Sequence, residues 1–119
     1  MKHFKLSEFK CPCCGRADMQ QEFLDKIDKA RDIAGVPFVI TSGFRCPKHN
    51  KEVGGKPDSA HTKGLAADIK CTNSRDRFRM IKALLEVGFT RIGVGKDFIH
   101  ADIDKSKPQE VIWTYYGKH

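Results

Sequence analysis

The stretch Ser59-Ala-His-Thr-Lys-Gly-Leu-Ala-Ala-Asp68 contains two side chains that metal ions prefer, His61 and Asp68. Further along the chain, Asp97-Phe-Ile-His100 adds a second imidazole. Catalytic zinc is held by three protein ligands of nitrogen or oxygen type and keeps a position for water, whereas structural zinc is usually closed by four ligands rich in cysteine. The set His61, Asp68 and His100 is of the open, catalytic kind.

The residues around these ligands predict where each one lies. Leu65–Lys70 is typical of a strand that carries Asp68, while His61 falls in the loop before it and Gly64 allows the chain to turn between them. His100 is expected on a neighbouring strand, Phe98–Ile103, because two ligands alone would hold an ion weakly.

Outward from this motif, apolar residues at helical spacing predict one helix from Met19 to about Ala34, which Gly35 ends. A second helix begins at a cap residue within Thr72-Asn-Ser and ends at Gly88. Its buried face is expected to include Phe78, Ile81, Leu84 and Leu85.

The remaining segments predict short strands and loops. They are a looped entry over 1–17, a strand at Phe38–Ser42, a polar loop from Gly43 through Arg45, His49 and Asn50 to Asp58, a strand at Arg91–Gly95, and a last strand or docked segment at Val111–Tyr116. This pattern predicts an α+β fold, with a small, mainly antiparallel sheet, two principal helices and a zinc site at the sheet edge and adjoining loops. We expect one domain over residues 1–119, with a cysteine-containing segment at 1–17 and the motif-bearing core at 38–104.

Composition narrows the class of protein. The formal charge of +7 and the pI near 9.3 favour polyanionic surroundings. A nucleic acid is not the expected partner, because no stripe of interleaved aromatic and basic residues is present. No apolar run is long enough for a bilayer span and no signal peptide is recognised, so we expect synthesis in the cytoplasm and no membrane insertion. We also expect a monomer.

Hydrolysis at such a site needs a proton acceptor for water and a positive charge for the oxyanion. Asp97, at a turn three residues before His100, is the favoured acid or base. Asp102 is the alternative, since it shares a strand face with His100. Arg45 is expected to supply the positive charge, and Ser59 to hydrogen-bond a substrate end group.

The order Ser42-Gly-Phe-Arg45, then Ser59-x-His-x-x-Gly-x-Ala-x-Asp68, then Asp97-x-x-His100 resembles the zinc peptidases of the D-alanyl-D-alanine carboxypeptidase family. That family includes vancomycin-resistance dipeptidases and the L-alanyl-D-glutamate endopeptidases used as bacteriophage endolysins. The resemblance implies one catalytic zinc on the three ligands, with Asp97 and Arg45 catalytic and with Ser59 and Arg45 binding substrate. It implies a metallopeptidase that hydrolyses an amide bond in peptidoglycan peptides and, like an endolysin, acts on the bacterial cell wall after release.

The sequence is compatible with a second function and with more than one role for the cysteines. A non-catalytic, metal-stabilised module that binds cell wall is the alternative function, and a protein side chain in the fourth metal position would indicate it. Cys11-x-x-Cys14 is half of a zinc knuckle, and Cys46 and Cys71 could complete it only if the fold brings them to the N-terminal segment. We therefore expect free thiols there and no second, structural metal.

Overall fold

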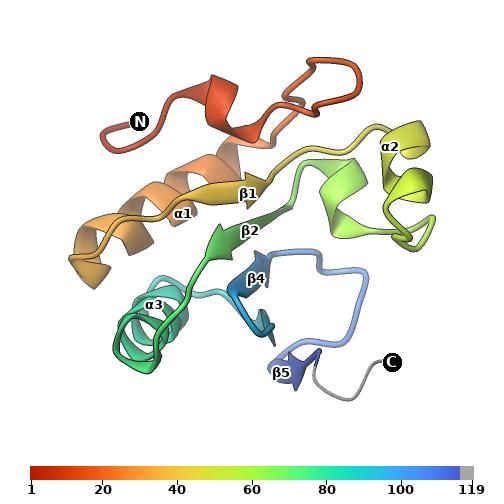
Figure 1. Ribbon diagram of the computed structural model, residues 1–119. Helices are drawn as coiled ribbons and strands as arrows, with labels where there is room; N and C mark the ends of the chain where they lie inside the picture. The colour runs from red at the N-terminus through yellow and green to blue at the C-terminus, as the bar shows by residue number, and fades with distance from the viewer. Residues whose placement is uncertain (116–119) are drawn as a thin grey trace.

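The computed structural model describes residues 1–115, and its order of elements agrees with an α+β chain (Figure 1). In chain order the elements are η1 (Leu6–Phe9), α1 (Gln21–Ala34), β1 (Ile40–Ser42), α2 (Pro47–Glu52), η2 (Ala60–Lys63), β2 (Ala66–Lys70), α3 (Ser74–Glu86), β3 (Arg91–Val94), β4 (Phe98–Asp102) and β5 (Val111–Thr114). Tyr116, which was expected at the end of the last strand, lies outside the described residues. No helix of the described part has the length and apolar content that a membrane span requires.

The five strands form one mixed sheet in the order β1-β2-β4-β3-β5. All neighbouring pairs are antiparallel except β3 and β5, which run parallel. The predicted fold class, α+β with a mainly antiparallel sheet, is therefore confirmed. The two strands that carry Asp68 and His100, β2 and β4, are hydrogen-bonded neighbours inside the sheet, so cross-strand pairing sets the distance between these two side chains.

Alternation along β2 and β4 separates the core from the site. Ala67 and Ile69 of β2 and Ala101 of β4 are fully buried in the core cluster with residues of α1 and α3. Because successive side chains on a strand point to opposite faces, Asp68 and His100 lie on the other face of the sheet. The helices α1 and α3 therefore support the strands from one side and leave the second face for polar side chains.

The long helices begin and end close to the predicted residues. The left-handed conformation of Gly35, with φ of 67°, ends α1, and the Asn73 side chain accepts a hydrogen bond from Asp76 N–H at the start of α3. The polar segment after β1 was predicted to be a loop throughout, but it contains the short helix α2. Pro47 occupies the first helical turn, where its missing N–H costs nothing, and this explains how a helix begins there.

The predicted buried face of α3 was wrong at two residues. Phe78 is 69% exposed and Leu85 is 49% exposed, whereas Met80, Ala83 and Leu84 are buried. Helical periodicity only constrains which residues share a face, and apolar residues lie on more than one face of this helix. Docking against α1 selects the face with Met80 and Leu84, and this choice depends on contacts far away in the sequence.

The N-terminal segment packs against the connection that follows β1. The Phe9 carbonyl oxygen accepts a hydrogen bond from Phe44 N–H at 2.8 Å, and Phe9 itself is fully buried. A Cβ at Gly43 would lie 2.6 Å from the Phe9 backbone, so this close approach requires glycine. Residues 43–45 are consequently held between the N-terminal segment and the polar face of the sheet.

Candidate functional site

Three predicted ligands meet on the polar face of the sheet. His61 comes from η2, Asp68 from β2 and His100 from β4, and each offers a ligand atom within 4.8 Å of the other two. Asp68 and His100 are direct partners across the two strands. Gly64, with φ of 71°, ends η2 in the left-handed region and brings His61 back over Asp68. The convergence expected from the sequence is therefore present in the structure.

A backbone carbonyl sets the orientation of His61. Its Nδ1 lies 2.8 Å from the carbonyl oxygen of Gly43. Since a carbonyl oxygen can only accept, Nδ1 must carry the proton and donate it. Nε2 then faces Asp68, with 3.3 Å between Nε2 and Oδ1. The ring is 3% exposed, so it has little freedom to turn away.

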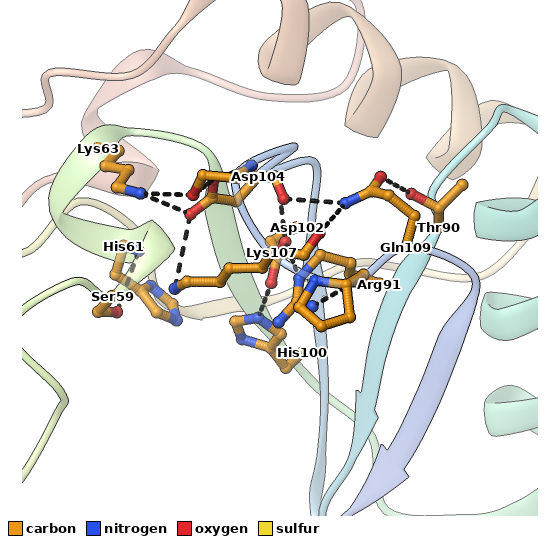
Figure 2. A network of polar contacts seen from close by, with 12 residues as sticks. Ser59, His61, Lys63, Thr90, Arg91, His100, Asp102, Asp104, Lys107 and Gln109 are labelled. Atoms are coloured by element: carbon orange, nitrogen blue, oxygen red, sulfur yellow. Dashed lines mark hydrogen bonds and ion pairs between the residues drawn. The ribbon is translucent and has the colours of Figure 1, made fainter.

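A carboxylate sets the orientation of His100 in the same way. Its Nε2 lies 2.7 Å from Oδ2 of Asp102, on the same strand face, as Figure 2 shows. Its Nδ1 lies 2.9 Å from Oδ1 of Asp68. Metal-binding histidines commonly donate their second N–H to a carboxylate or a backbone carbonyl, which fixes the ring and makes the ligand more basic. Both imidazoles of this site have such a partner.

The three inward-facing atoms require a positive charge between them. With both imidazoles neutral and donating to Gly43 and Asp102, the lone pairs of His61 Nε2 and His100 Nδ1 both point at Oδ1 of Asp68. Three acceptors at this separation repel one another unless a proton or a metal ion lies among them. Two imidazole nitrogens and a carboxylate oxygen are suitable ligands for zinc, so the residues present fit the ion that the resemblance implies.

The close contact between these side chains lowers the pKa of Asp68 and raises the pKa of His100. Burial alone would raise the pKa of Asp68, but hydrogen bonds from His100 and His61 outweigh it and lower that pKa well below its usual range. Burial alone would lower the pKa of His100, but its contacts with Asp102 and Asp68 outweigh it and raise that pKa. In the metal-free protein, these contacts favour the protonated form of His100, whose positive charge would lie among the ligand atoms.

Because zinc and this proton compete for His100, pH should change the melting temperature of the metal-free and zinc-bound protein in opposite directions. The raised pKa of His100 contributes stability below its ordinary value of 6.5, and this contribution is lost as pH rises through the folded-state pKa. Zinc must displace the same proton, so the increase in melting temperature on adding zinc should grow as pH rises above about 6.5. Differential scanning fluorimetry with and without zinc measures this, and the difference between wild type and His61→Ala isolates this site. A zinc effect that did not change with pH would contradict the assigned proton positions.

The ligands open into a cavity of about 660 Å³ whose lining is strongly charged. Its wall includes the basic residues Arg45, Lys56, Arg91 and Lys107, the acidic residues Asp58, Asp68 and Asp102, and the aromatic residues Phe98, Trp113 and Tyr115. Hydrogen bonds hold several of the cations in place, and this arrangement suits a substrate that carries carboxylate groups.

Arg45 lies in this cavity, close to the ligands as predicted. Its Nε donates to Ser42 Oγ at 3.1 Å, its Nη1 donates to Asn50 Oδ1 at 3.2 Å, and its Nη2 lies 3.5 Å from Oδ2 of Asp68. Asn50 is 2% exposed and also donates to the carbonyl oxygen of Lys56 at 2.7 Å. Sequence reasoning missed this asparagine, because only the turn of α2 brings it behind Arg45.

A polar network extends behind His100 toward β3 and the segment after β4 (Figure 2). Asp102 accepts from Arg91 Nε at 2.8 Å and from the backbone N–H of Asp104 at 3.0 Å. Lys63 Nζ then donates to Asp104 Oδ2 at 2.9 Å, which connects this network to η2. The guanidinium of Arg91 lies 5.0 Å from the ring centre of Trp113 on β5. The sequence offered no signal for Arg91, Asp104 or Trp113 beyond their being polar or aromatic.

The other predicted site residues occupy distinct places. Ser59 lines the cavity, and its Oγ accepts the backbone N–H of His61 at 3.2 Å, so it caps η2 at the mouth of the site. Asp102 is 1% exposed and engaged at both oxygens. Asp97 is exposed and lines an adjacent hollow of about 550 Å³, which shares Asp68 with the main cavity. In the described part of the chain, the Asp97 carboxylate takes part in no hydrogen bond or ion pair.

Comparison with known proteins gives one assignment. A family model described as Peptidase M15 matches residues 2–102, which include the N-terminal segment and all three ligands. No curated protein matches the chain.

Proposed function

Because this chain belongs to the peptidase M15 family, as the sequence resemblance predicted, we propose that it is a zinc metallopeptidase that hydrolyses amide bonds in peptidoglycan peptides. The observation that supports this most strongly is the convergence of His61 Nε2, Asp68 Oδ1 and His100 Nδ1 at the base of a charged cavity. Zinc bound there would polarise a carbonyl group and lower the pKa of water.

Three side chains of the protein would carry out the rest of the reaction: oxyanion stabilisation, proton transfer and positioning of a ligand. We assign to Arg45 the stabilisation of the oxyanion, because its guanidinium lies beside Asp68 and is held by Ser42 and Asn50. We assign the proton transfer from water to the leaving amine to Asp97, which is exposed and lines the hollow that also includes Asp68. Asp102 then acts as a positioning residue, since it fixes the tautomer of His100.

The charge of the cavity supports an acidic peptide as substrate. Lys56 and Lys107 lie on its wall with Arg45, and Lys107 Nζ donates to the carbonyl oxygen of Asp58 at 2.7 Å. Stem peptides of peptidoglycan contain free carboxylates, which these cations can bind. We further propose that the enzyme acts on the bacterial cell wall in the manner of a bacteriophage endolysin. It would cleave as an endopeptidase or a carboxypeptidase.

Digestion of purified peptidoglycan tests this function. The zinc-loaded protein should release soluble fragments with new amino and carboxyl ends, a chelator should stop the release, and added zinc should restore it. Mass spectrometry of the fragments identifies the bond, which separates L-Ala-D-Glu, D-Ala-D-Ala and cross-bridge cleavage. Sedimentation of the protein with the cell wall without any new ends would instead support the metal-stabilised binding module.

A further inference from the structure

A second group of potential metal ligands lies in the cysteines outside the site described above. Cys11, Cys14 and Cys46 each place their sulfur within 4.8 Å of the other two. Cys11 and Cys14 belong to the N-terminal segment, whereas Cys46 follows Arg45 at the start of α2. The fold thus brings Cys46, but not Cys71, to the N-terminal pair Cys11 and Cys14. Cys71 stays apart, with its thiol donating to the carbonyl oxygen of Asn73.

The sulfur separation suits a shared metal ion, and the three cysteines are free thiols in the structure. The Sγ atoms of Cys11 and Cys46 are 3.7 Å apart, whereas bonded sulfurs are separated by about 2.05 Å. A tetrahedral zinc site with zinc–sulfur distances of about 2.3 Å has sulfur–sulfur edges of about 3.8 Å. The distance between these two sulfurs therefore corresponds to the edge of a zinc–thiolate tetrahedron.

Backbone groups support the same arrangement. The N–H of Cys46 points at Cys11 Sγ with 3.5 Å between N and S, and the N–H of His49 points at Cys46 Sγ at 3.4 Å. Such bonds stabilise the negative charge of a thiolate ligand. Within the N-terminal segment, Gly15 N–H donates to the carbonyl oxygen of Cys11 at 2.7 Å, which closes a tight turn and folds Cys14 back toward Cys11.

We propose that Cys11, Cys14 and Cys46 bind a structural zinc ion that links the N-terminal segment to the connection between β1 and α2. Two neighbours can supply a fourth ligand. Cys13 is adjacent in the turn, and His49 stands three residues after Cys46, so that Cys11-x-x-Cys14 and Cys46-x-x-His49 form two pairs of the kind found in structural zinc sites.

This ion would act on the peptidase site indirectly. Cys46 directly follows Arg45, whose backbone N–H donates to the carbonyl oxygen of His61 at 3.2 Å. The linked segment also includes Gly43, whose carbonyl oxygen orients the His61 ring. The second zinc would thus fix the wall of the cavity without touching substrate.

Cobalt substitution tests the proposal independently of peptidase activity. The reduced, full-length protein is titrated with Co²⁺, and sulfur-to-cobalt charge-transfer absorption reports thiolate ligands, which the His61, Asp68 and His100 site lacks. We expect this absorption to reach its maximum before two equivalents of cobalt per chain have been added, since the second candidate site, His61, Asp68 and His100, takes up cobalt without thiolate ligands, and to disappear when zinc displaces cobalt. His61→Ala should retain it, so failure of the peptidase proposal would not remove the signal.

Single substitutions identify the ligands. Cys14→Ser replaces an exposed thiol, and Cys46→Ser retains a good helix-capping residue, so neither change opens a cavity in the core. Both should abolish the charge-transfer absorption, while Cys71→Ala should leave it unchanged. A shift of the visible cobalt bands in Cys13→Ser or in His49→Gln would identify the fourth ligand.

Two results would overturn the proposal. One is the absence of thiolate-to-cobalt absorption in the reduced wild-type protein, or its persistence in both Cys14→Ser and Cys46→Ser. The other is a protein that is isolated two hydrogens lighter, with Cys11 and Cys46 joined as a disulfide and no bound metal after reduction. In that case Cys11 and Cys46 would form a redox-sensitive link instead of a zinc site.

Discussion

Replacing His61 with alanine is expected to remove the catalytic metal and nearly all peptidase activity. The substitution leaves Asp68 and His100 as the only two ligands of the set, and a two-ligand site holds zinc weakly. A catalytic metal contributes several kcal/mol to transition-state stabilisation, and each 1.4 kcal/mol corresponds to a factor of ten, so kcat/KM should fall by at least about 10³-fold. Metal content after dialysis and the rate of peptidoglycan cleavage measure the two effects.

The matched control for this variant is His3→Ala. His3 lies near the N-terminus, where its Nε2 contacts Asp32 on α1, and its replacement should leave both metal content and activity unchanged. Since His61 is buried, melting temperatures of the variant and wild type are compared in the presence of a chelator, which separates loss of the fold from loss of the ion. Full activity of the correctly folded variant would remove the basis of the proposed mechanism.

Asp97→Asn is expected to lower kcat by about 10²- to 10⁴-fold while the protein still binds its metal, which is the range that a general acid or base contributes. Asp97 is exposed and not engaged with other described side chains, so the isosteric change should leave the melting temperature almost unaltered. Activity and metal content are measured on the same preparations over a range of pH.

Asp102→Asn serves as the contrasting variant. Asp102 accepts hydrogen bonds from His100 and Arg91, so its neutralisation should weaken metal binding by about 10- to 100-fold and also lower stability. Saturating zinc should restore much of its turnover if Asp102 only positions His100. If Asp97→Asn were fully active, and zinc-saturated Asp102→Asn were inactive, the role of base would pass to Asp102.

Local patterns in the sequence predicted the elements that carry the site. Asp68 was predicted on a strand and His100 on a neighbouring strand, and both predictions agree with the structure, whereas His61, predicted in the loop before Asp68, lies in the short helix η2. These features depend on short-range preferences, such as strand-forming residues around Asp68 and a glycine at position 64 that adopts a positive φ.

Features set by tertiary packing could not be predicted in this way. The exposed position of Phe78 reflects how α3 docks, since apolar residues occupy several faces of this helix. The hydrogen-bond partners of the two ligand imidazoles also depend in part on tertiary packing. Asp102 is close to His100 in sequence and its shared strand face was predicted, whereas the Gly43 carbonyl reaches His61 only because the connection after β1 packs beside η2. The meeting of Cys46 with Cys11 likewise depends on Phe9 holding residues 43–45.

The order of ligands along the chain also affects how the enzyme is made. Asp68 and His100 are 32 residues apart in sequence yet pair across β2 and β4, and β5, which carries Trp113 against the His100 ring, follows later still. On the ribosome, Asp68 therefore emerges well before its partner. A nascent chain therefore cannot bring the three ligands together until the residues through β4 have left the exit tunnel, and the His100 ring gains its contact with Trp113 only after β5 has followed.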